Sequence, residues 1–211
     1  KERSFDTVEI VLDERVNSKE DVKKLGISVG DFVCVEPRAH ITNTGYIKSR
    51  FLDDKLSVAT LYAYASYLKE NNIKLDKKVY FLITVYEEVG HGGSYIPSDV
   101  TEAISVDMGC VGEGLECDET QVSICAKDSS GPYDYEMITR LVELSKENKL
   151  NYAVDIYPQY GSDVSAALRG GNDIKGALIG PGVHASHGME RTHYDGVENT
   201  MKLVVSYITK Y

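Results

Sequence analysis

The sequence contains no apolar run that approaches the length of a membrane span, although 42% of its 211 residues are hydrophobic. A membrane-spanning helix needs about 20 consecutive apolar residues, so we expect a soluble protein. Basic residues are also too few for a nucleic-acid-binding stripe: 23 lysines and arginines face 33 aspartates and glutamates, for a net charge of −10. Because nucleic-acid binding depends on lysine and arginine contacts to phosphate, this balance argues against DNA or RNA as a partner.

Cysteines are few and widely spaced, at Cys34, Cys110, Cys117 and Cys125. None of them forms a C-x-x-C pair, so the spacing predicts neither a disulfide framework nor a structural zinc site. Reduced thiols in a cytoplasmic protein are the simplest interpretation. The sequence shows no signal peptide and begins without a methionine, and we expect it to be part of a longer polypeptide.

The chain has two parts that differ in their expected secondary structure. Residues 1–50 combine expected strands at 7–12, 32–36 and 45–51 with a short helix from Ser18 to Gly26, which predicts a small β-rich unit. From residue 51 onward strands and helices alternate, and this order predicts an α/β domain whose mostly parallel sheet is flanked by helices. The expected helices are 56–68, 133–149, 162–168 and 197–211, and the expected strands are 79–85, 102–107, 121–126, 152–156 and 174–179.

The stretch from Lys77 to Gly93 is central to this pattern. Val79–Val85 is a nearly continuous apolar run, which is typical of a strand buried on both faces. Glu87 and Glu88 follow directly, at the carboxyl end where open α/β sheets bind their ligands. Neighbouring side chains in an extended chain point in different directions, so one glutamate can bind a metal while the other faces water or substrate. Taken alone, the two glutamates are equally well explained as solvent-exposed residues where the strand passes into a loop.

Further metal-type ligands stand at the ends of other expected elements: Asp53 and Asp54 before a helix, Asp107 after a strand, and His184 and His187 after the last strand. Carboxylates mixed with imidazoles suit zinc, cobalt or manganese. A pair of cations about 3.5–4 Å apart needs a bridging carboxylate and terminal ligands, and this inventory supplies them. Each residue also has an ordinary explanation, as a helix cap, a turn residue or a surface histidine. Their coincidence at element ends favours a metal site.

Five segments in this order carry a resemblance to a known family: Leu52-Asp53-Asp54-Lys55, Tyr86-Glu87-Glu88-Val89-Gly90, Val106-Asp107, Gly161-Ser162-Asp163 and a late histidine. Over nearly all of residues 5–211 the sequence resembles the M42 metallo-aminopeptidases. The resemblance implies the α/β fold of di-metal exopeptidases of the phosphorylase/hydrolase-like class, with a small β-rich inserted domain that helps build homo-oligomers. Residues 1–50 are then expected to be part of that insert, and residues 51–211 the catalytic domain.

The resemblance also implies a role for each ligand. Asp53 would bridge two divalent metal ions, zinc, cobalt or manganese, while Glu88 would bind one ion and Asp107 the other. His187, within Ser-His-Gly-Met-Glu, would be the last ligand, with His184 as the alternative.

The remaining motif residues would serve catalysis and substrate binding. Glu87 would be the general base that takes a proton from the bridging water, and Asp54 would shape the peptide next to the bridging carboxylate. Gly161, Ser162 and Asp163 would line the substrate pocket. The expected activity is release of amino-terminal residues from short peptides in the cytoplasm, without nucleic-acid or membrane partners.

Two departures from the family pattern affect this hypothesis. Lys55 stands where the family usually has arginine, and lysine cannot reproduce the planar fork of hydrogen bonds that arginine makes. The family's first metal ligand is a histidine of an H-x-D motif well before the β-rich domain, yet no histidine here precedes His40. We therefore expect the amino-terminal portion of the catalytic domain to be missing from these residues, and metal binding by this chain alone to be weak.

Two other functions compete with the aminopeptidase hypothesis. One is a catalytically impaired, oligomeric or peptide-binding homologue, which Lys55 and the missing H-x-D motif favour. The other is a glycanase on the same scaffold, which would need two carboxylates and no metal.

Overall fold

The computed structural model describes residues 4–210, which form two compact units divided between Glu36 and Pro37. The first unit holds the 3-10 helix η1 (Phe5–Thr7) and the helix α1 (Lys19–Lys24). Ser18 caps α1, since its hydroxyl accepts a hydrogen bond from the Asp21 amide at 3.1 Å. The predicted strands at 7–12 and 32–36 are wrong, because no neighbouring strand pairs with either of them among the described residues.

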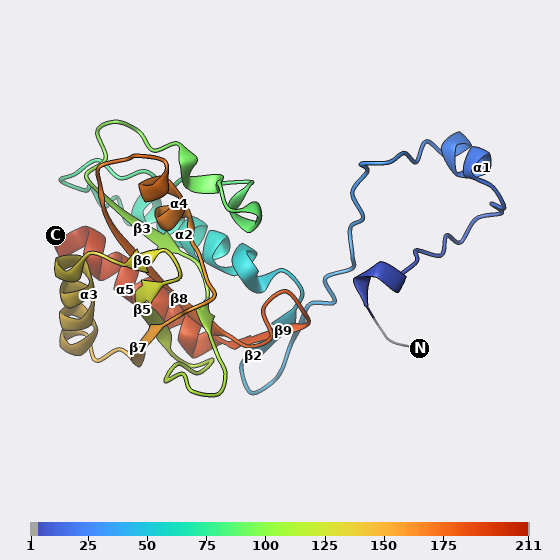
Figure 1. The fold of residues 1–211 in the computed structure, drawn as a ribbon. Coiled ribbons are helices and arrows are strands. Elements are labelled where there is room, and N and C mark those ends of the chain that lie inside the picture. The colour runs from blue at the N-terminus through green and yellow to red at the C-terminus, as the bar shows by residue number, and fades with distance from the viewer. Residues whose placement is uncertain (1–3, 211) are drawn as a thin grey trace. The chain divides into compact units, whose positions relative to one another are not determined.

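The second unit is built on a six-stranded sheet. It contains β3 (Glu102–Val106), β4 (Gly109–Cys110), β5 (Val122–Asp128), β6 (Gly131–Pro132), β7 (Tyr152–Ile156) and β8 (Lys175–Val183). β3 and β4 run parallel to β8, and β7 runs parallel to β5, whereas β5 is antiparallel to both β8 and β6. Figure 1 shows β3, β8, β5 and β7 within the second unit. The predicted α/β class is confirmed, and its sheet is mixed.

Helices cover both faces of this sheet. α2 (Leu52–Glu70), α3 (Tyr135–Glu147) and α5 (Tyr194–Lys210) share a core cluster with Val122 and Ile124 of β5. The next residue of β5, Cys125, packs with Val164 of α4 (Asp163–Arg169) in a second cluster. Because successive residues of a strand point to opposite faces, α4 covers the face opposite to the other three. The elements predicted beyond residue 100 are confirmed with small shifts of their ends; Tyr211, the predicted end of the last helix, lies outside the described residues.

A smaller antiparallel sheet adjoins the start of α2. It consists of β1 (His40–Ile41), β2 (Tyr46–Ser49) and β9 (Glu190–His193), in that order. The strand predicted at 45–51 is thus confirmed as β2. The turn before β2 needs glycine at position 45, where φ is +91° and a Cβ would lie 2.6 Å from the His193 ring.

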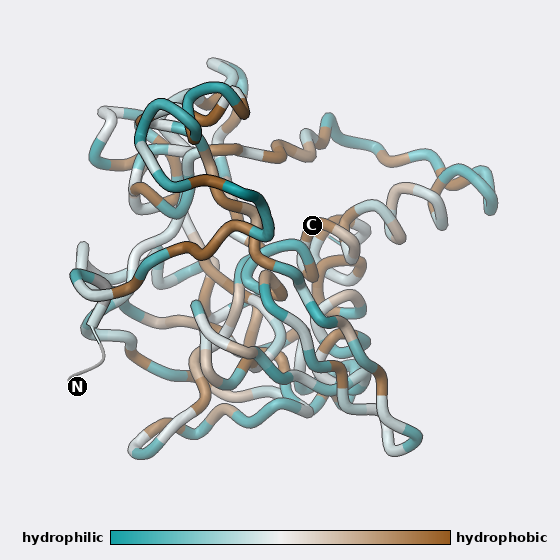
Figure 2. Tube along the Cα trace, turned by 90° about the vertical axis from the view of Figure 1, so that its right-hand side faces the viewer, coloured by the Kyte–Doolittle hydropathy of each residue, from teal (hydrophilic) through white to brown (hydrophobic). Residues whose placement is uncertain are grey.

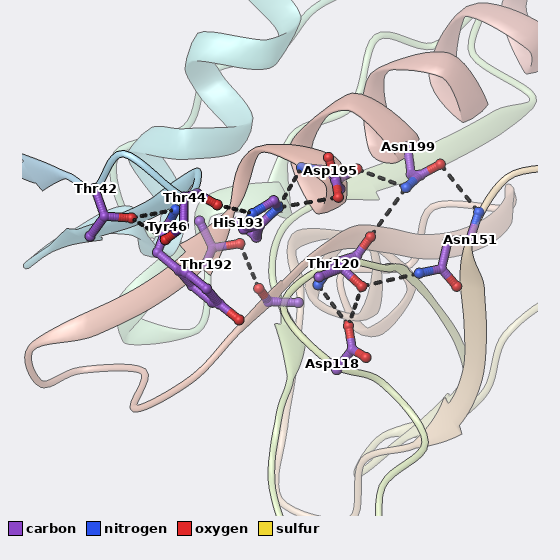
Figure 3. A network of polar contacts seen from close by, with 11 residues as sticks. Thr42, Thr44, Tyr46, Asp118, Thr120, Asn151, Thr192, His193, Asp195 and Asn199 are labelled. Atoms are coloured by element: carbon purple, nitrogen blue, oxygen red, sulfur yellow. Dashed lines mark hydrogen bonds and ion pairs between the residues drawn. The ribbon is translucent and has the colours of Figure 1, made fainter.

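Polar contacts join β9 to the chain around it (Figure 3). The His193 ring contacts the Thr44 carbonyl at 2.8 Å, and the Thr192 hydroxyl donates to the Gly182 carbonyl at 2.7 Å. One turn into α5, Asn199 donates to the Thr120 carbonyl and accepts from the Asn151 amide. β9 is therefore held from the β2 side and from the main sheet.

The strand predicted at 79–85 is wrong. Side-chain burial alternates there as in an extended segment, with Val79 and Phe81 half-buried and Tyr80 and Leu82 exposed. The segment nevertheless belongs to no sheet. Lys78 and Tyr80, two positions apart, both reach the Asp99 carboxylate from one side. The apolar pattern is that of a strand, but a strand also needs a paired neighbour.

Hydrophobic and hydrophilic residues alternate in short stretches along the chain (Figure 2). Among residues 4–210, no helix combines the length and the apolar character required to cross a membrane.

Gly180 of β8 allows the closest backbone approach in the main sheet. A Cβ at this position would lie 1.8 Å from the Asp107 carbonyl oxygen, whereas a Cβ at Gly112 would meet nothing within 4 Å. We expect Gly180→Ala to push β8 away from the end of β3 and to lower the free energy of unfolding by about 1–3 kcal/mol. Urea denaturation followed by circular dichroism measures this, with Gly112→Ala as the matched control. Equal midpoints for the two variants would contradict the prediction.

Candidate functional site

Three of the predicted metal ligands converge from separate parts of the chain. Asp53 lies at the start of α2, Glu88 in the 3-10 helix η2 (Glu87–Val89), and His187 in the turn between β8 and β9. One ligand atom from each lies within 4.8 Å of the other two. The His187 Nε2 atom is 3.1 Å from a Glu88 oxygen and 3.4 Å from an Asp53 oxygen. Two carboxylates and an imidazole in this arrangement can hold a divalent cation.

Glu190, the first residue of β9, fixes two of these ligands. Its carboxylate is buried and accepts a hydrogen bond from the Asp53 amide at 3.1 Å and from the His187 amide at 3.0 Å. A single carboxylate thereby joins the start of α2 to the turn that carries the histidine. The Ser186 hydroxyl adds a hydrogen bond of 2.8 Å to the Asp53 side chain.

The local backbone at both of these ligands departs from regular structure. Asp53 has φ −80° and ψ 103° inside the range of α2, and its peptide bond to Asp54 is cis. His187 has a φ of 64° in the left-handed region.

Asp107, predicted to bind the second cation, lies just after β3. Its carboxylate is buried and accepts from the Met108 amide at 2.7 Å, and its carbonyl accepts from the Ser57 hydroxyl of α2 at 2.9 Å. Burial raises the pKa of its carboxyl well above the ordinary value, and the charges of Asp53 and Glu87 raise it further. Asp107 does not belong to the cluster of three ligands, so its metal role stays a prediction.

Glu87, predicted to be the general base, has the electrostatics of a proton carrier. Burial raises the pKa of its carboxyl to about 7, with further contributions from the charges of Asp163, Glu88 and Asp53, while His187 opposes the shift. A carboxyl with a pKa near neutrality can both accept and release a proton at physiological pH.

Asp163 and Asp54 each hold a buried oxygen without a hydrogen-bond partner among the described residues. Asp163 begins α4 after the cap residue Ser162, and its other oxygen accepts from the Thr84 hydroxyl at 2.7 Å. Burial raises the pKa of Asp54 well above its ordinary value, and the charge of Asp107 adds to the shift. Gly161 immediately precedes the cap, so the predicted Gly-Ser-Asp segment forms the entry to α4.

The structure also locates the predicted alternatives. His184 lies outside the cluster, and its backbone forms an antiparallel bridge with Arg191. The Lys55 ammonium lies 4.7 Å from the centre of the Phe51 ring. The sequence does contain one H-x-D triplet, His193-Tyr194-Asp195, at the start of α5; there the His193 Nδ1 atom accepts from the Asp195 amide at 3.1 Å (Figure 3).

Two cavities meet at Glu88. One, of about 290 Å³, is lined by Arg50, Phe51, Asp53, Glu88, His187, Gly188 and Glu190. The other, of about 950 Å³, has an acidic end formed by Asp54, Glu87, Glu88, Asp107 and Asp163. The cluster of three ligands is therefore accessible from the smaller cavity, and Glu87 faces the larger one.

Sequence reasoning assigned no role to three residues whose side chains hydrogen-bond to the site: Glu190, Ser186 and Thr84. Glu190 does leave a signal, because it follows His187 by three residues in a short turn. Thr84 leaves none, since its partner Asp163 is distant in sequence.

Comparison with known proteins identifies the family. Residues 1–203 match the family described as M42 glutamyl aminopeptidase, and the chain belongs to this family. The protein of Bacillus subtilis (strain 168) named "Putative aminopeptidase YhfE" is 49% identical over 208 residues, which cover 98% of this chain and 60% of that protein.

Two solved structures share the fold. Aminopeptidase APDkam598 from the archaeon Desulfurococcus kamchatkensis has a TM-score of 0.78 and 22% identity, with 93% of this chain and 58% of that chain covered. The Pyrococcus horikoshii TET1 peptidase has a TM-score of 0.72 and 22% identity, with 82% and 54% covered. The chain therefore spans between half and two thirds of the length of these proteins.

Removing the Glu190 charge tests its orienting role. Glutamine at this position replaces one of the two acceptor oxygens by an NH₂ group, which cannot accept from the Asp53 or His187 amide. We expect Glu190→Gln to weaken zinc binding by about 10-fold or more, as loss of a group that orients ligands does. Isothermal titration of metal-free protein measures this. The control Glu198→Gln removes an exposed carboxylate paired with Lys202, and equal zinc affinities for both variants would remove Glu190 from this role.

The raised pKa of Glu87 predicts a pH-dependent stability in metal-free protein. Between pH 4.5 and 7 the folded protein keeps a proton on Glu87 that the unfolded chain releases, so its contribution to the free energy of unfolding falls as pH rises through this window. We expect Glu87→Gln to raise the melting temperature relative to the native protein at pH 8, and to raise it less at pH 4.5. Thermal melts in EDTA check this, and a pH-independent difference would contradict it.

Proposed function

We propose that the protein is a metal-dependent aminopeptidase that releases amino-terminal residues from short peptides. The observation that carries this proposal is the convergence of Asp53, Glu88 and His187, with Glu87 directly beside Glu88, in a member of the M42 family. The fold likeness to aminopeptidase APDkam598 supports the same conclusion.

The residues present fit a divalent cation. Their donor set combines carboxylate oxygens with an imidazole nitrogen, and Glu190 orients two of the ligands through their amides. In this proposal Asp53, Glu88 and His187 would hold one cation, and Asp53 together with Asp107 would hold a second. When bound, such cations lower the pKa of a shared water and polarise the carbonyl of the scissile peptide bond. Zinc, cobalt and manganese all accept these ligands.

Glu87 moves the proton in this reaction. Its carboxylate takes a proton from the attacking water and passes it to the nitrogen of the leaving amine, which departs as the peptide shortened by one residue. The half-buried position of Glu87 favours this role, since burial and nearby carboxylates bring its pKa to about 7.

The negative charge of the site also selects the substrate. Asp54, Glu87, Glu88 and Asp163 all line the larger cavity. A protonated α-amine is attracted by these charges, which gives the enzyme its requirement for a free amino terminus. At the start of α4, Asp163 lines this cavity whereas Gly161 and Ser162 do not; in this proposal the three residues together would contact the amino end of the peptide.

The protein would act as a homo-oligomer in the cytoplasm. The Pyrococcus horikoshii TET1 peptidase, which shares the fold, can assemble into a tetrahedron or a large octahedral shell. We assign residues 1–50 to the oligomer interface. Exposed apolar side chains within this stretch, among them Val11, Val29 and Phe32, fit burial against other subunits.

Glu87→Gln separates the chemical step from metal binding. We expect this variant of the complete protein, loaded with zinc, cobalt or manganese, to lose about 10²–10⁴-fold in kcat toward amino-acid p-nitroanilides, because it has no proton carrier. Metal analysis should show unchanged metal content.

Chelation provides the second arm of this experiment. EDTA should abolish the activity of the native protein, and added cation should restore it. Hydrolysis of p-nitroanilides that survives chelation would contradict a metal-dependent reaction, and native activity retained by Glu87→Gln would exclude Glu87 as the base.

A further inference from the structure

A buried chain of polar side chains joins β5 to the start of α4. Asp128, the last residue of β5, is buried, and so are Tyr133 and Ser162. The Tyr133 hydroxyl donates to the Asp128 carboxylate at 2.8 Å and lies 2.7 Å from the Ser162 Oγ atom. We call these three residues the Asp–Tyr–Ser chain.

The donors and acceptors of the Asp–Tyr–Ser chain allow one direction only. A phenol has a single proton and a carboxylate only accepts, so Tyr133 donates to Asp128 and must accept from the Ser162 hydroxyl. Burial raises the pKa of Tyr133 well above its ordinary value, so the phenol keeps this proton. The second oxygen of Asp128 accepts from the Ser130 amide at 2.7 Å. The position of the Ser162 oxygen is therefore set by a carboxylate that is itself fixed at both oxygens.

The Ser162 oxygen in turn fixes the first turn of α4. It accepts from the Ser165 amide at 3.3 Å, and the Ser165 hydroxyl lies 2.8 Å from the Ser162 amide, which completes a capping box. The chain just before α4 is held as well, because the Ser129 amide and hydroxyl donate to the Tyr160 carbonyl at 3.1 and 2.5 Å. These bonds set the position of Asp163, the first residue of the helix.

Asp163 packs closely against the segment that carries Glu87. One of its carboxylate oxygens accepts from the Thr84 hydroxyl at 2.7 Å. A Cβ at Gly92 would lie 2.5 Å from the other carboxylate oxygen, and a Cβ at Gly93 would lie 2.0 Å from the Asp163 carbonyl oxygen. Glycine at these two positions allows the close approach, so a shift of Asp163 would displace the loop that follows Glu87.

We propose, on the basis of the function proposed above, that Tyr133 is a positioning residue of the aminopeptidase. Through Ser162 it holds the Asp163 carboxylate toward the larger cavity, where Asp163 receives the protonated α-amine of the substrate. Asp163 lines this cavity, whereas Tyr133 lines neither of the two cavities. The second carboxylate oxygen of Asp163 is buried and has no hydrogen-bond partner among the described residues. A buried acceptor without a donor costs free energy, which a substrate ammonium group would recover.

Tyr133→Phe in the complete, metal-loaded protein removes only the hydroxyl. Asp128 and Ser162 then lose their shared partner, and Asp163 is no longer held toward the amine. We expect kcat/KM toward amino-acid p-nitroanilides to fall by about 10–100-fold, as misplacement of a binding group causes, almost entirely through a higher KM. The zinc affinity should stay native, because Glu190 and not this chain orients the cation ligands.

Inhibition by the free amino acid of the p-nitroanilide used gives a readout specific to the amine. It should weaken by about 10-fold or more in Tyr133→Phe, whereas inhibition by the same acid without its α-amine should be unchanged. Tyr207→Phe is the matched control, since the buried Tyr207 hydroxyl also donates to a carboxylate, that of Glu102 at 2.7 Å. Glu102 begins β3, at the opposite end of this strand from Asp107. The control should leave KM and both inhibition constants native.

A double-mutant cycle tests whether the two hydroxyls act as one chain. Ser162→Ala removes the next link and should raise KM as Tyr133→Phe does. Because both changes interrupt the same chain, the double variant should have a KM close to that of the more affected single variant, and the two effects should not add.

A native KM in Tyr133→Phe would overturn the proposal, as would an equal effect of Tyr207→Phe or additive effects in the cycle. A parallel loss of kcat, zinc affinity and inhibition by both acids would make the role of Tyr133 merely structural.

Failure of the proposed function gives a different result. A complete native protein that cleaves no p-nitroanilide would reject the aminopeptidase activity, but calorimetric binding of the free amino acid still measures amine recognition without turnover. Weaker binding by Tyr133→Phe than by Tyr207→Phe would then support the positioning role, and equal binding would overturn it.

Discussion

The crowding of carboxylates at one end of the sheet is the constraint on which the rest of the site depends. Asp107 and Glu190 are buried, and burial raises the pKa of each of them, as it does for Glu87 and Glu88. Groups of like charge held together away from water oppose one another's ionisation. A bound divalent cation would reverse that opposition. The arrangement is therefore costly to fold without a cation and suited to binding one.

Hydrogen bonds from backbone amides help to hold the ligands in place against this repulsion. The Glu190 carboxylate accepts two amide hydrogen bonds, one from His187 nearby and one from Asp53, 137 residues away in the chain. Hydrogen bonds to a charged acceptor are stronger than neutral ones. One acidic residue thus stabilises the position of others, and the negative charge of Glu190 is satisfied by the backbone without requiring a cation of its own.

Much of the fold was predictable because its signals are local. The periodicity of α3, the apolar runs of β5 and β7 and the Ser18 cap are properties of short windows, and each predicted element is present. The segment 79–85 has an equally strong apolar run but no paired neighbour among the described residues. Strand formation depends on a partner that can be distant in sequence, and this dependence explains the wrong predictions at 7–12, 32–36 and 79–85. The site shows the same dependence on contacts distant in sequence. Asp53, Glu88 and His187 belong to recognisable motifs and could be predicted, whereas the hydrogen bond of Thr84 to Asp163 forms only in the folded chain.

The larger cavity and the metal site share their carboxylates. Glu87 and Glu88 follow the segment from Lys77 to Val85, which lines one side of this cavity, and Asp107 follows β3, which lines the other. The described residues offer three clustered ligands to one cation, while a second cation would find Asp107 and a shared Asp53. Structural and catalytic zinc ions use three or four protein ligands, so a second cation held by Asp53 and Asp107 would need at least one further ligand.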